Sequence, residues 1–169
     1  MICPEIRSIE IRLEAFRQAL KDVGRPNDAL ALYLNNIYLK HRFEDIELFT
    51  DVLPTLETLR GKYSLGLISN GNSYPERCGL EGIFRFVIFS QEYNVEKPDP
   101  RIFQIALEKA GCSKRELLHV GDSLTDDVAG AINAGINCVW LNRHKVKNNL
   151  GLKIDYEISS LLKLLDILE

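Results

Sequence analysis

Two short polar segments follow apolar runs and carry side chains suited to phosphate and metal chemistry. In the first, Ser69-Asn70-Gly71, a hydroxyl stands beside amides that a tight turn can expose, and such groups bind phosphate oxygens. The second runs from Asp122 to Asp127, and its carboxylates suit a hard cation such as Mg²⁺, which takes one or two carboxylates together with waters and substrate phosphate. Ordinary turn formation is the competing interpretation of the first segment.

A lysine lies between these segments, directly before Pro-Asp-Pro. Asp99 is placed to cap the helix that follows, and Pro100 suits the first position of that helix. A helix start fixed in this way would hold Lys97 in one direction, as a point charge for phosphate and carboxylates. The competing interpretation is a solvated lysine beside a helix start.

The acidic residues of the second segment differ in how well a local structural role explains them. Asp126 and Asp127 would favour the positive end of a following helix, with Thr125 as its cap. Asp122 precedes that helix, so this role does not account for it. Asp122 is therefore the more specific indication of a metal site.

Short apolar runs that alternate with helical stretches must position these residues. We expect strands at 63–68, 86–89, 117–120, 138–141 and 156–158, and helices at 5–23 (with a short strand at 9–13 as the alternative), 28–42, 51–60, 74–80, 100–110, 125–134 and after Ser159 or Ser160. Near-continuous apolar strands predict an α/β fold with a parallel sheet covered on both faces. Ligands bind beyond the carboxyl ends of such strands. The change in pattern predicts a helical segment over 1–50 and an α/β segment over 51–169.

The composition is that of a globular chain of ordinary size. The 169 residues are 46% hydrophobic and 27% charged, with a formal net charge of −3. Such a balance gives no basic footprint for nucleic acid, and no apolar run approaches the roughly 20 residues of a membrane span. The 4 cysteines have no C-x-x-C spacing, and the first residues lack a signal-peptide pattern. We therefore expect reduced thiols and a cytoplasmic protein.

Three segments together resemble motifs of the haloacid dehalogenase (HAD) superfamily. Ile-Ser-Asn-Gly-Asn, Glu-Lys-Pro-Asp-Pro and Gly-Asp-Ser-Leu-Thr-Asp-Asp resemble its second, third and fourth motifs, in that order. The resemblance covers 51–141 and implies a three-layer Rossmann-like core with part of a helical cap, and a Mg²⁺-dependent phosphatase. The residues that it implicates are Ser69, Asn70, Gly71 and Lys97 for phosphate binding, Lys97 as the one catalytic residue present, and Asp122 and Asp127 for metal binding.

One motif of the family has no counterpart in this sequence. No Asp-X-Asp occurs in the chain, and that motif supplies the nucleophile and the acid/base from the end of the central first strand. Residues 1–6 are too short for such a strand, contain Pro4 and have no aspartate. The resemblance therefore implies a vacancy between the strands that lead to Ser69 and Asp122. We expect the 169 residues to be an amino-terminally shortened form of a longer protein, inactive by itself.

Several functions remain open at this point. The leading one is a Mg²⁺-dependent hydrolase of a small phosphomonoester, and the second is a non-catalytic relative that binds phosphate and metal as a regulatory module. The third is a chain that pairs with a partner, or with another copy of itself, to complete the sheet. A dehalogenase is less favoured, because the fourth motif of dehalogenases is rich in serine and asparagine where this chain has Gly121-Asp122. Arg143, His144 and Tyr74 follow strand ends, where substrate contact and ordinary loop surface are the alternatives.

Overall fold

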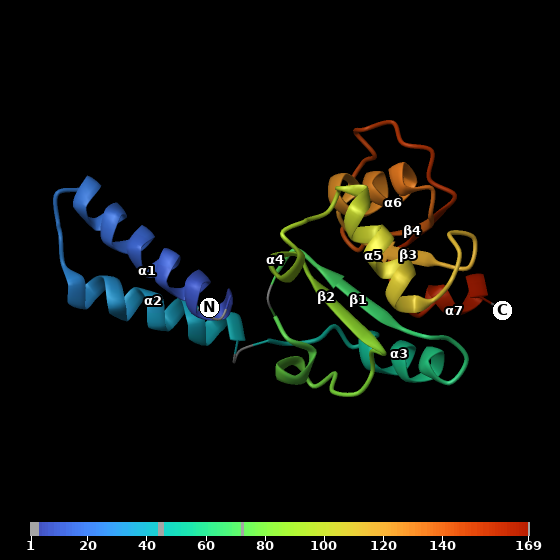
Figure 1. Ribbon diagram of the computed structural model, residues 1–169, viewed down its shortest axis with the longest axis horizontal. Coiled ribbons are helices and arrows are strands. Elements are labelled where there is room, and N and C mark those ends of the chain that lie inside the picture. Colours follow the sequence, from blue (N-terminus) through green and yellow to red (C-terminus); the bar gives the residue numbers. More distant parts are fainter. Residues whose placement is uncertain (1–3, 44–45, 72, 169) are drawn as a thin grey trace. The chain divides into compact units, whose positions relative to one another are not determined.

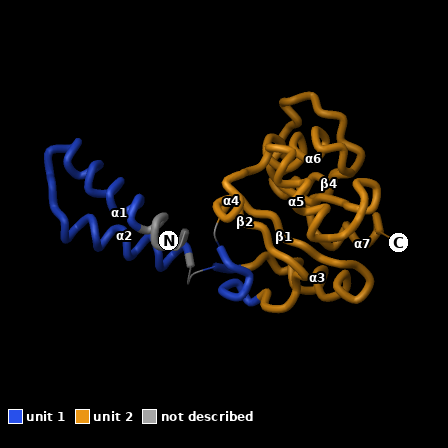
Figure 2. Tube along the Cα trace, in the orientation of Figure 1, with its two compact units in different colours: residues 1–47, 72–79 blue, residues 48–71, 80–169 orange. Residues whose placement is uncertain are grey.

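The computed structural model describes residues 4–43, 46–71 and 73–168. The chain divides into two compact units, which Figure 2 shows in different colours. The first unit comprises residues 1–47 and 72–79, and the second comprises residues 48–71 and 80–169. Residues 1–3, part of the segment considered above for a first strand, lie outside the described residues.

The first unit contains a hairpin of two helices (Figure 1), α1 (Pro4–Asp22) and α2 (Asp28–Phe43). The helical periodicity predicted both, and the strand alternative at 9–13 is wrong, because those residues lie within α1. The side chain of Asn27 accepts a hydrogen bond from the Leu30 N–H at 2.9 Å and so caps α2. The helix expected at 74–80 is only a single 3₁₀ turn, η1 (Pro75–Cys78), which ends at Gly79 with φ +71°.

The described residues of the second unit form five parallel strands in two sheets. β1 (Gly66–Ser69) pairs with β2 (Phe86–Phe89), side by side in Figure 1. The other sheet has the order β3-β4-β5, formed by β3 (Leu118–Gly121), β4 (Asn137–Leu141) and β5 (Tyr156–Ile158). The expected α/β fold class is confirmed, and the predicted strands lie within three residues of the observed ones.

Helices cover the sheets from both sides. On one side α5 (Pro100–Ala110) packs on β1, β2 and α6 (Ala129–Ala134), and its buried Phe103 belongs to a core cluster that also contains Ile88 and Trp140. A second cluster joins Leu59 of α3 (Val52–Arg60) and Leu164 of α7 (Lys163–Leu168) to Val139. No helix in the described part of the chain is both long and apolar enough to cross a membrane.

Two helical details differ from the sequence-based expectation. The short helix α4 (Ser90–Tyr93) was not predicted. The helix expected at 125–134 is a π-helical turn, η2 (Leu124–Val128), followed by α6. The cap of this turn is Ser123, whose hydroxyl accepts from the Asp126 N–H at 3.1 Å, and not Thr125. A π-turn shifts the following side chains around the helix axis, and such turns often occur at functional sites.

Candidate functional site

Lys97 joins the ends of two strands that belong to different sheets. Its ammonium group donates to Oδ1 of Asp127 at 2.6 Å and to the main-chain carbonyl of Ile68 at 3.3 Å. Ile68 belongs to β1, and Asp127 lies in the turn that follows β3. The carboxyl ends of β1 and β3 therefore meet at this one cation. Ser69, the last residue of β1, follows Ile68 directly.

Asp127 is a buried carboxylate with three hydrogen-bond donors. Besides Lys97, Nε2 of His119 lies 3.0 Å from Oδ1, and the Ser123 N–H donates to Oδ2 at 3.0 Å. Because an ionised carboxylate only accepts, Nε2 of His119 must carry the proton. Burial raises the pKa of Asp127, but the His119 hydrogen bond and the charge of Lys97 outweigh it and hold that pKa well below its usual range. Asp127 therefore stays ionised and keeps Lys97 in place.

Asn70 positions Lys97 through the backbone. Its side-chain amide donates to the Lys97 carbonyl at 2.9 Å, and its side-chain oxygen accepts from the Lys97 N–H at 2.8 Å. Asp99 accepts from the Arg101 N–H at 2.9 Å and caps α5, with Pro100 at its first position, as predicted. The Asn70 side chain thus holds the lysine loop, so phosphate contact by Asn70 would have to use its main-chain N–H.

The turn after β1 closes on the Ser69 hydroxyl. The Gly71 N–H donates to Oγ of Ser69 at 3.0 Å, and the Ser90 hydroxyl donates to the Asn70 carbonyl at 3.3 Å. These bonds fix the backbone of the turn beside Lys97. The Ser69 hydroxyl keeps its own proton for a further acceptor, because in its bond with Gly71 it acts as the acceptor.

Asp122 is exposed, and its carboxylate has no hydrogen-bond or ion-pair partner among the described residues. Its backbone is nevertheless fixed, because the indole N–H of the buried Trp140 donates to the Asp122 carbonyl at 3.0 Å. Gly121 is needed for a steric reason, since a Cβ at that position would run into the carboxyl group of Asp127. Sequence reasoning missed Trp140 entirely. It also missed His119, whose only signal was a polar residue inside an apolar run.

Asp122 and Asp127 differ in how they could take part in binding a hard cation. Within 4–43, 46–71 and 73–168, no group of three or more histidine, cysteine, aspartate or glutamate side chains is arranged to hold a metal. Asp122 offers a free carboxylate, whereas both oxygens of Asp127 already accept hydrogen bonds. Mg²⁺ commonly uses one or two carboxylates and completes its shell with water and phosphate. The donor set fits such an open site and does not form a closed protein cage.

Arg143 is bound by a second buried carboxylate. Its guanidinium forms two hydrogen bonds with Asp51, at 2.8 and 2.9 Å. The Ser160 hydroxyl and the Leu161 N–H also donate to Asp51, at 2.6 and 2.8 Å. The Arg143 hydrogen bonds hold the pKa of Asp51 well below its usual range, against the opposing effect of burial. Arg143 therefore fixes the loop after β4. Because its guanidinium already binds Asp51, a substrate contact by Arg143 is disfavoured. The neighbouring His144 is exposed.

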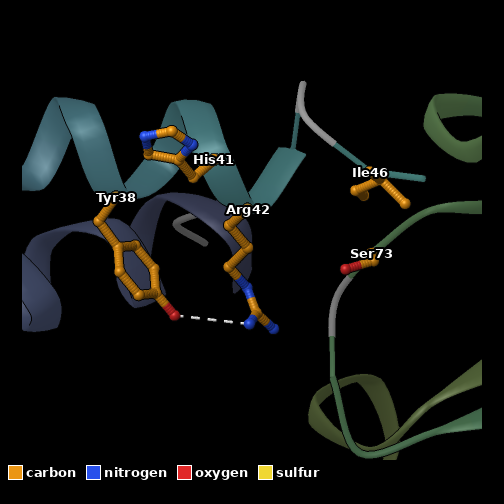
Figure 3. Close-up of a pocket in the computed structure, with 5 residues that line it drawn as sticks. All are labelled: Tyr38, His41, Arg42, Ile46 and Ser73. Atoms are coloured by element: carbon orange, nitrogen blue, oxygen red, sulfur yellow. Dashed lines mark hydrogen bonds between the residues drawn. The ribbon is translucent and has the colours of Figure 1, made fainter.

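The helical unit has a pocket of its own. A cavity of about 420 Å³ is lined by Tyr38, His41, Arg42, Ile46 and Ser73 (Figure 3). The Arg42 guanidinium donates to the Tyr38 hydroxyl at 3.4 Å, as the dashed line in Figure 3 shows. This pocket shares no residue with the site around Lys97.

The family profile and the most similar curated proteins agree on one family. The sequence profile of the haloacid dehalogenase-like hydrolases matches residues 7–141. The chain is 35% identical over 141 residues to the pyrimidine 5′-nucleotidase YjjG of Escherichia coli K12, covering 80% of this chain and 63% of that protein. It is 33% identical over 142 residues to a glyceraldehyde 3-phosphate phosphatase of Methanothermobacter thermautotrophicus, covering 76% of this chain and 63% of that protein.

Solved structures agree with this result. A 2-haloacid dehalogenase from Pseudomonas syringae superposes with a TM-score of 0.78 at 32% identity, covering 95% of this chain and 70% of that one. A HAD phosphatase from Thermococcus onnurineus gives a TM-score of 0.73 at 27% identity, covering 98% of this chain and 90% of that one. The chain spans 63% of the length of each of the two curated relatives described above.

Proposed function

Because the chain belongs to the haloacid dehalogenase-like hydrolase family, we propose that it is a phosphatase-type member acting on a small phosphomonoester. The relatives named above include a nucleotidase and a sugar-phosphate phosphatase, which supports phosphate-ester chemistry. The observation that carries the proposal is Lys97, a largely buried cation between the ends of β1 and β3, with the unpartnered carboxylate of Asp122 after β3. Cation and carboxylate at one sheet edge suit a phosphate–metal pair.

Each residue has a distinct task in this proposal. The Ser69 hydroxyl and the turn amides after it would bind phosphoryl oxygens, and Lys97 would neutralise their charge. Asp127 and Asn70 hold Lys97 in position, from its side chain and its backbone. Asp122 would hold Mg²⁺, which when bound supplies further charge neutralisation at the phosphoryl group. Asp127 would support the metal site indirectly, through Ser123, whose N–H it binds.

The covalent step needs a group that the sequence lacks. Without Asp-X-Asp there is no counterpart of the family's nucleophile, so we propose that the 169-residue chain alone does not turn over phosphomonoesters. An upstream reading frame without a strand ending in Asp-X-Asp would contradict the prediction of a longer parent protein.

Residues 1–50 are proposed to be part of a substrate-selecting helical cap, and the proposed location is the cytoplasm. Self-association that completes the sheet also stays a prediction, tested by sedimentation.

The direct test measures binding rather than turnover. Isothermal titration with Mg²⁺ and with inorganic phosphate should show both ligands binding to the wild-type chain. Asp122→Asn should weaken Mg²⁺ binding roughly tenfold or more, since it removes the free carboxylate. The matched control is Asp126→Asn, which makes the same change of charge in the same turn, and it should leave Mg²⁺ affinity within about twofold. Equal effects of the two substitutions would contradict the assignment of Asp122.

Two other functions have specific support. The similarity to a 2-haloacid dehalogenase favours halide release, which ion chromatography with 2-chloropropionate would detect. An exposed Asp122 argues against it, because that carboxylate would repel a carboxylate substrate unless a cation neutralised it. The absence of Asp-X-Asp favours a non-catalytic binding module. That module would bind Mg²⁺ and phosphate without turnover of p-nitrophenyl phosphate, and turnover by this chain would exclude it.

A further inference from the structure

The peptide unit between Asp122 and Ser123 is held from both of its sides. Its carbonyl, which belongs to Asp122, accepts from the indole N–H of Trp140 at 3.0 Å. Its N–H, which belongs to Ser123, donates to Oδ2 of Asp127 at 3.0 Å. Because a peptide unit is planar, hydrogen bonds at its carbonyl and at its N–H together fix the orientation of the plane. The main chain that carries the Asp122 side chain is therefore clamped between β4 and η2.

The indole of this clamp is fixed by the core. Trp140 is almost completely buried and belongs to the same core cluster as Phe103. In the β3–β4 register it pairs with Gly121, the residue directly before Asp122. An indole N–H only donates, and a buried one needs an acceptor. The Asp122 carbonyl supplies that acceptor, so a displacement of this carbonyl would leave the buried indole N–H unpaired.

The Asp122 carboxylate depends on this main chain for its direction. The carboxylate is exposed and has no partner among the described residues, so no side-chain contact orients it. An aspartate carboxylate is separated from the main chain by only two rotatable bonds. The orientation of the main chain therefore limits where the carboxylate can lie. A fixed main chain also reduces the conformational entropy that is lost when a cation binds.

We propose that Trp140 is a positioning residue for the cation-binding carboxylate. Together with Asp127, it holds the Asp122–Ser123 peptide unit so that the Asp122 carboxylate is directed before Mg²⁺ binds. This inference rests on the proposed function, because it takes Asp122 as the Mg²⁺ ligand, and it adds that a buried core side chain sets the affinity. Because coupling between two sites is reciprocal, Mg²⁺ binding at Asp122 also changes the surroundings of the indole N–H.

The first experiment uses the wild-type chain, whose single tryptophan gives one indole N–H signal in a ¹H–¹⁵N NMR spectrum. Titration with Mg²⁺ should move this signal along a saturating curve, with the same midpoint that calorimetry gives for Mg²⁺ binding. Asp122→Asn should abolish the movement at the same Mg²⁺ concentrations, whereas the control Asp126→Asn should keep it. An indole signal that stays in place while Mg²⁺ binds would overturn the inference.

The second experiment removes the indole N–H with Trp140→Phe, which keeps an aromatic ring in the core. Mg²⁺ affinity should fall roughly threefold to tenfold, and amide exchange of Ser123 should become faster, because the peptide unit loses one of its two contacts. Phosphate affinity should stay within about twofold, since Lys97 keeps its hydrogen bond to Asp127. The matched control is Ile88→Ala, which removes side-chain volume from the same core cluster on a different strand. It should lower stability and leave Mg²⁺ affinity within about twofold.

The outcomes separate this inference from the proposed function. If the wild-type chain binds no Mg²⁺, the metal part of the proposed function fails and this inference fails with it. If Asp122 is needed for Mg²⁺ binding but Trp140→Phe binds Mg²⁺ as tightly as the wild type, only this inference is overturned. Equal losses of Mg²⁺ affinity in Trp140→Phe and Ile88→Ala would indicate a general effect on the fold and overturn the positioning role. If Trp140→Phe does not fold, the wild-type indole signal decides: its movement with Mg²⁺ supports the inference, and its constancy overturns it.

Discussion

Asp51 and Asp127 are both buried, both ionised and both bound to a basic side chain, but their surroundings differ. Asp51 binds Arg143 through two parallel hydrogen bonds, and Ser160 and Leu161 supply the remaining donors. Asp127 binds Lys97 through one hydrogen bond, and the lysine also donates to the main-chain carbonyl of Ile68 in β1. The first centre is enclosed by three chain segments, whereas the second joins the end of β1 to the turn after β3.

This difference distinguishes Asp51, which joins parts of the fold, from Asp127, which holds the lysine of the proposed phosphate site. The bidentate hydrogen bonds of Arg143 fix the plane and direction of its guanidinium. Because Asp51 also accepts from Ser160 and Leu161, it connects the start of α3 to the loops after β4 and β5. A lysine ammonium has three donors on a flexible stem and can exchange one acceptor for another. In the proposed function, Lys97 would keep its hydrogen bond to Asp127 and exchange the Ile68 carbonyl for a phosphate oxygen. Both ion pairs lie after the carboxyl ends of strands, and only the Lys97 pair belongs to the proposed phosphate site.

The largest effect should come from Asp51→Asn. The substitution leaves the largely buried Arg143 guanidinium without its carboxylate, which should lower the free energy of unfolding by about 3 kcal/mol. Urea unfolding monitored by circular dichroism measures this loss. Asp126→Asn, the surface control, should change the same quantity by less than about 0.5 kcal/mol. A loss below about 1 kcal/mol for Asp51→Asn would mean that the Asp51 centre is not structural.

Acid should weaken the fold through the same two carboxylates. Each has a folded pKa below that of an unfolded aspartate, so its stabilising contribution is complete above about pH 4 and is lost as the pH falls further. Wild-type stability should therefore change little between pH 7 and 5 and decrease steeply below pH 4. Asp51→Asn should flatten that decrease, since one of the two groups no longer titrates. An equally steep decrease in the variant would mean that Asp51 does not contribute to the loss of stability in acid.

The contrast between the two centres also explains what the sequence could reveal. Strand periodicity, the Asp99 cap and the order of the polar segments depend on residues only a few positions apart, and local patterns predicted them. The partners of Asp51 lie 92, 109 and 110 residues further along the chain, so no local pattern could identify the centre. Asp51 was read only as a helix start.

The details of the candidate site were partly hidden for the same reason. Trp140 reaches the Asp122 carbonyl from β4, 18 residues away, and a tryptophan in an apolar run is indistinguishable from a core residue. The π-turn moved the cap from Thr125 to Ser123, because Val128 donates back five residues to the Ser123 carbonyl. Lys97 was identified by its proline-rich surroundings, but its contact with Ile68 depends on how β1 and β3 are placed by the fold.

Lys97→Gln should affect ligand binding more than stability. Without the ammonium group, phosphate affinity should fall roughly tenfold, about 1.4 kcal/mol, because the cation at the end of β1 is lost. His119 and the Ser123 N–H still bind Asp127, so the free energy of unfolding should change by less than about 1 kcal/mol. Phosphate titration and urea unfolding of the same sample measure both quantities. A larger effect on stability than on phosphate affinity would make Lys97 a structural residue like Arg143.

The smallest effect should come from Arg143→Lys, which gives the Asp51 centre a lysine, the kind of cation that Asp127 binds. A lysine keeps the charge but forms one hydrogen bond where the guanidinium forms two, and it loses the stacking of Arg143 over Phe49, now 4.2 Å from the ring centre. Unfolding should become easier by about 1 kcal/mol, while phosphate and Mg²⁺ affinities stay unchanged. If this swap weakened phosphate binding as much as Lys97→Gln does, the two centres would be coupled through the sheet, and the separation of structural and ligand-binding roles would fail.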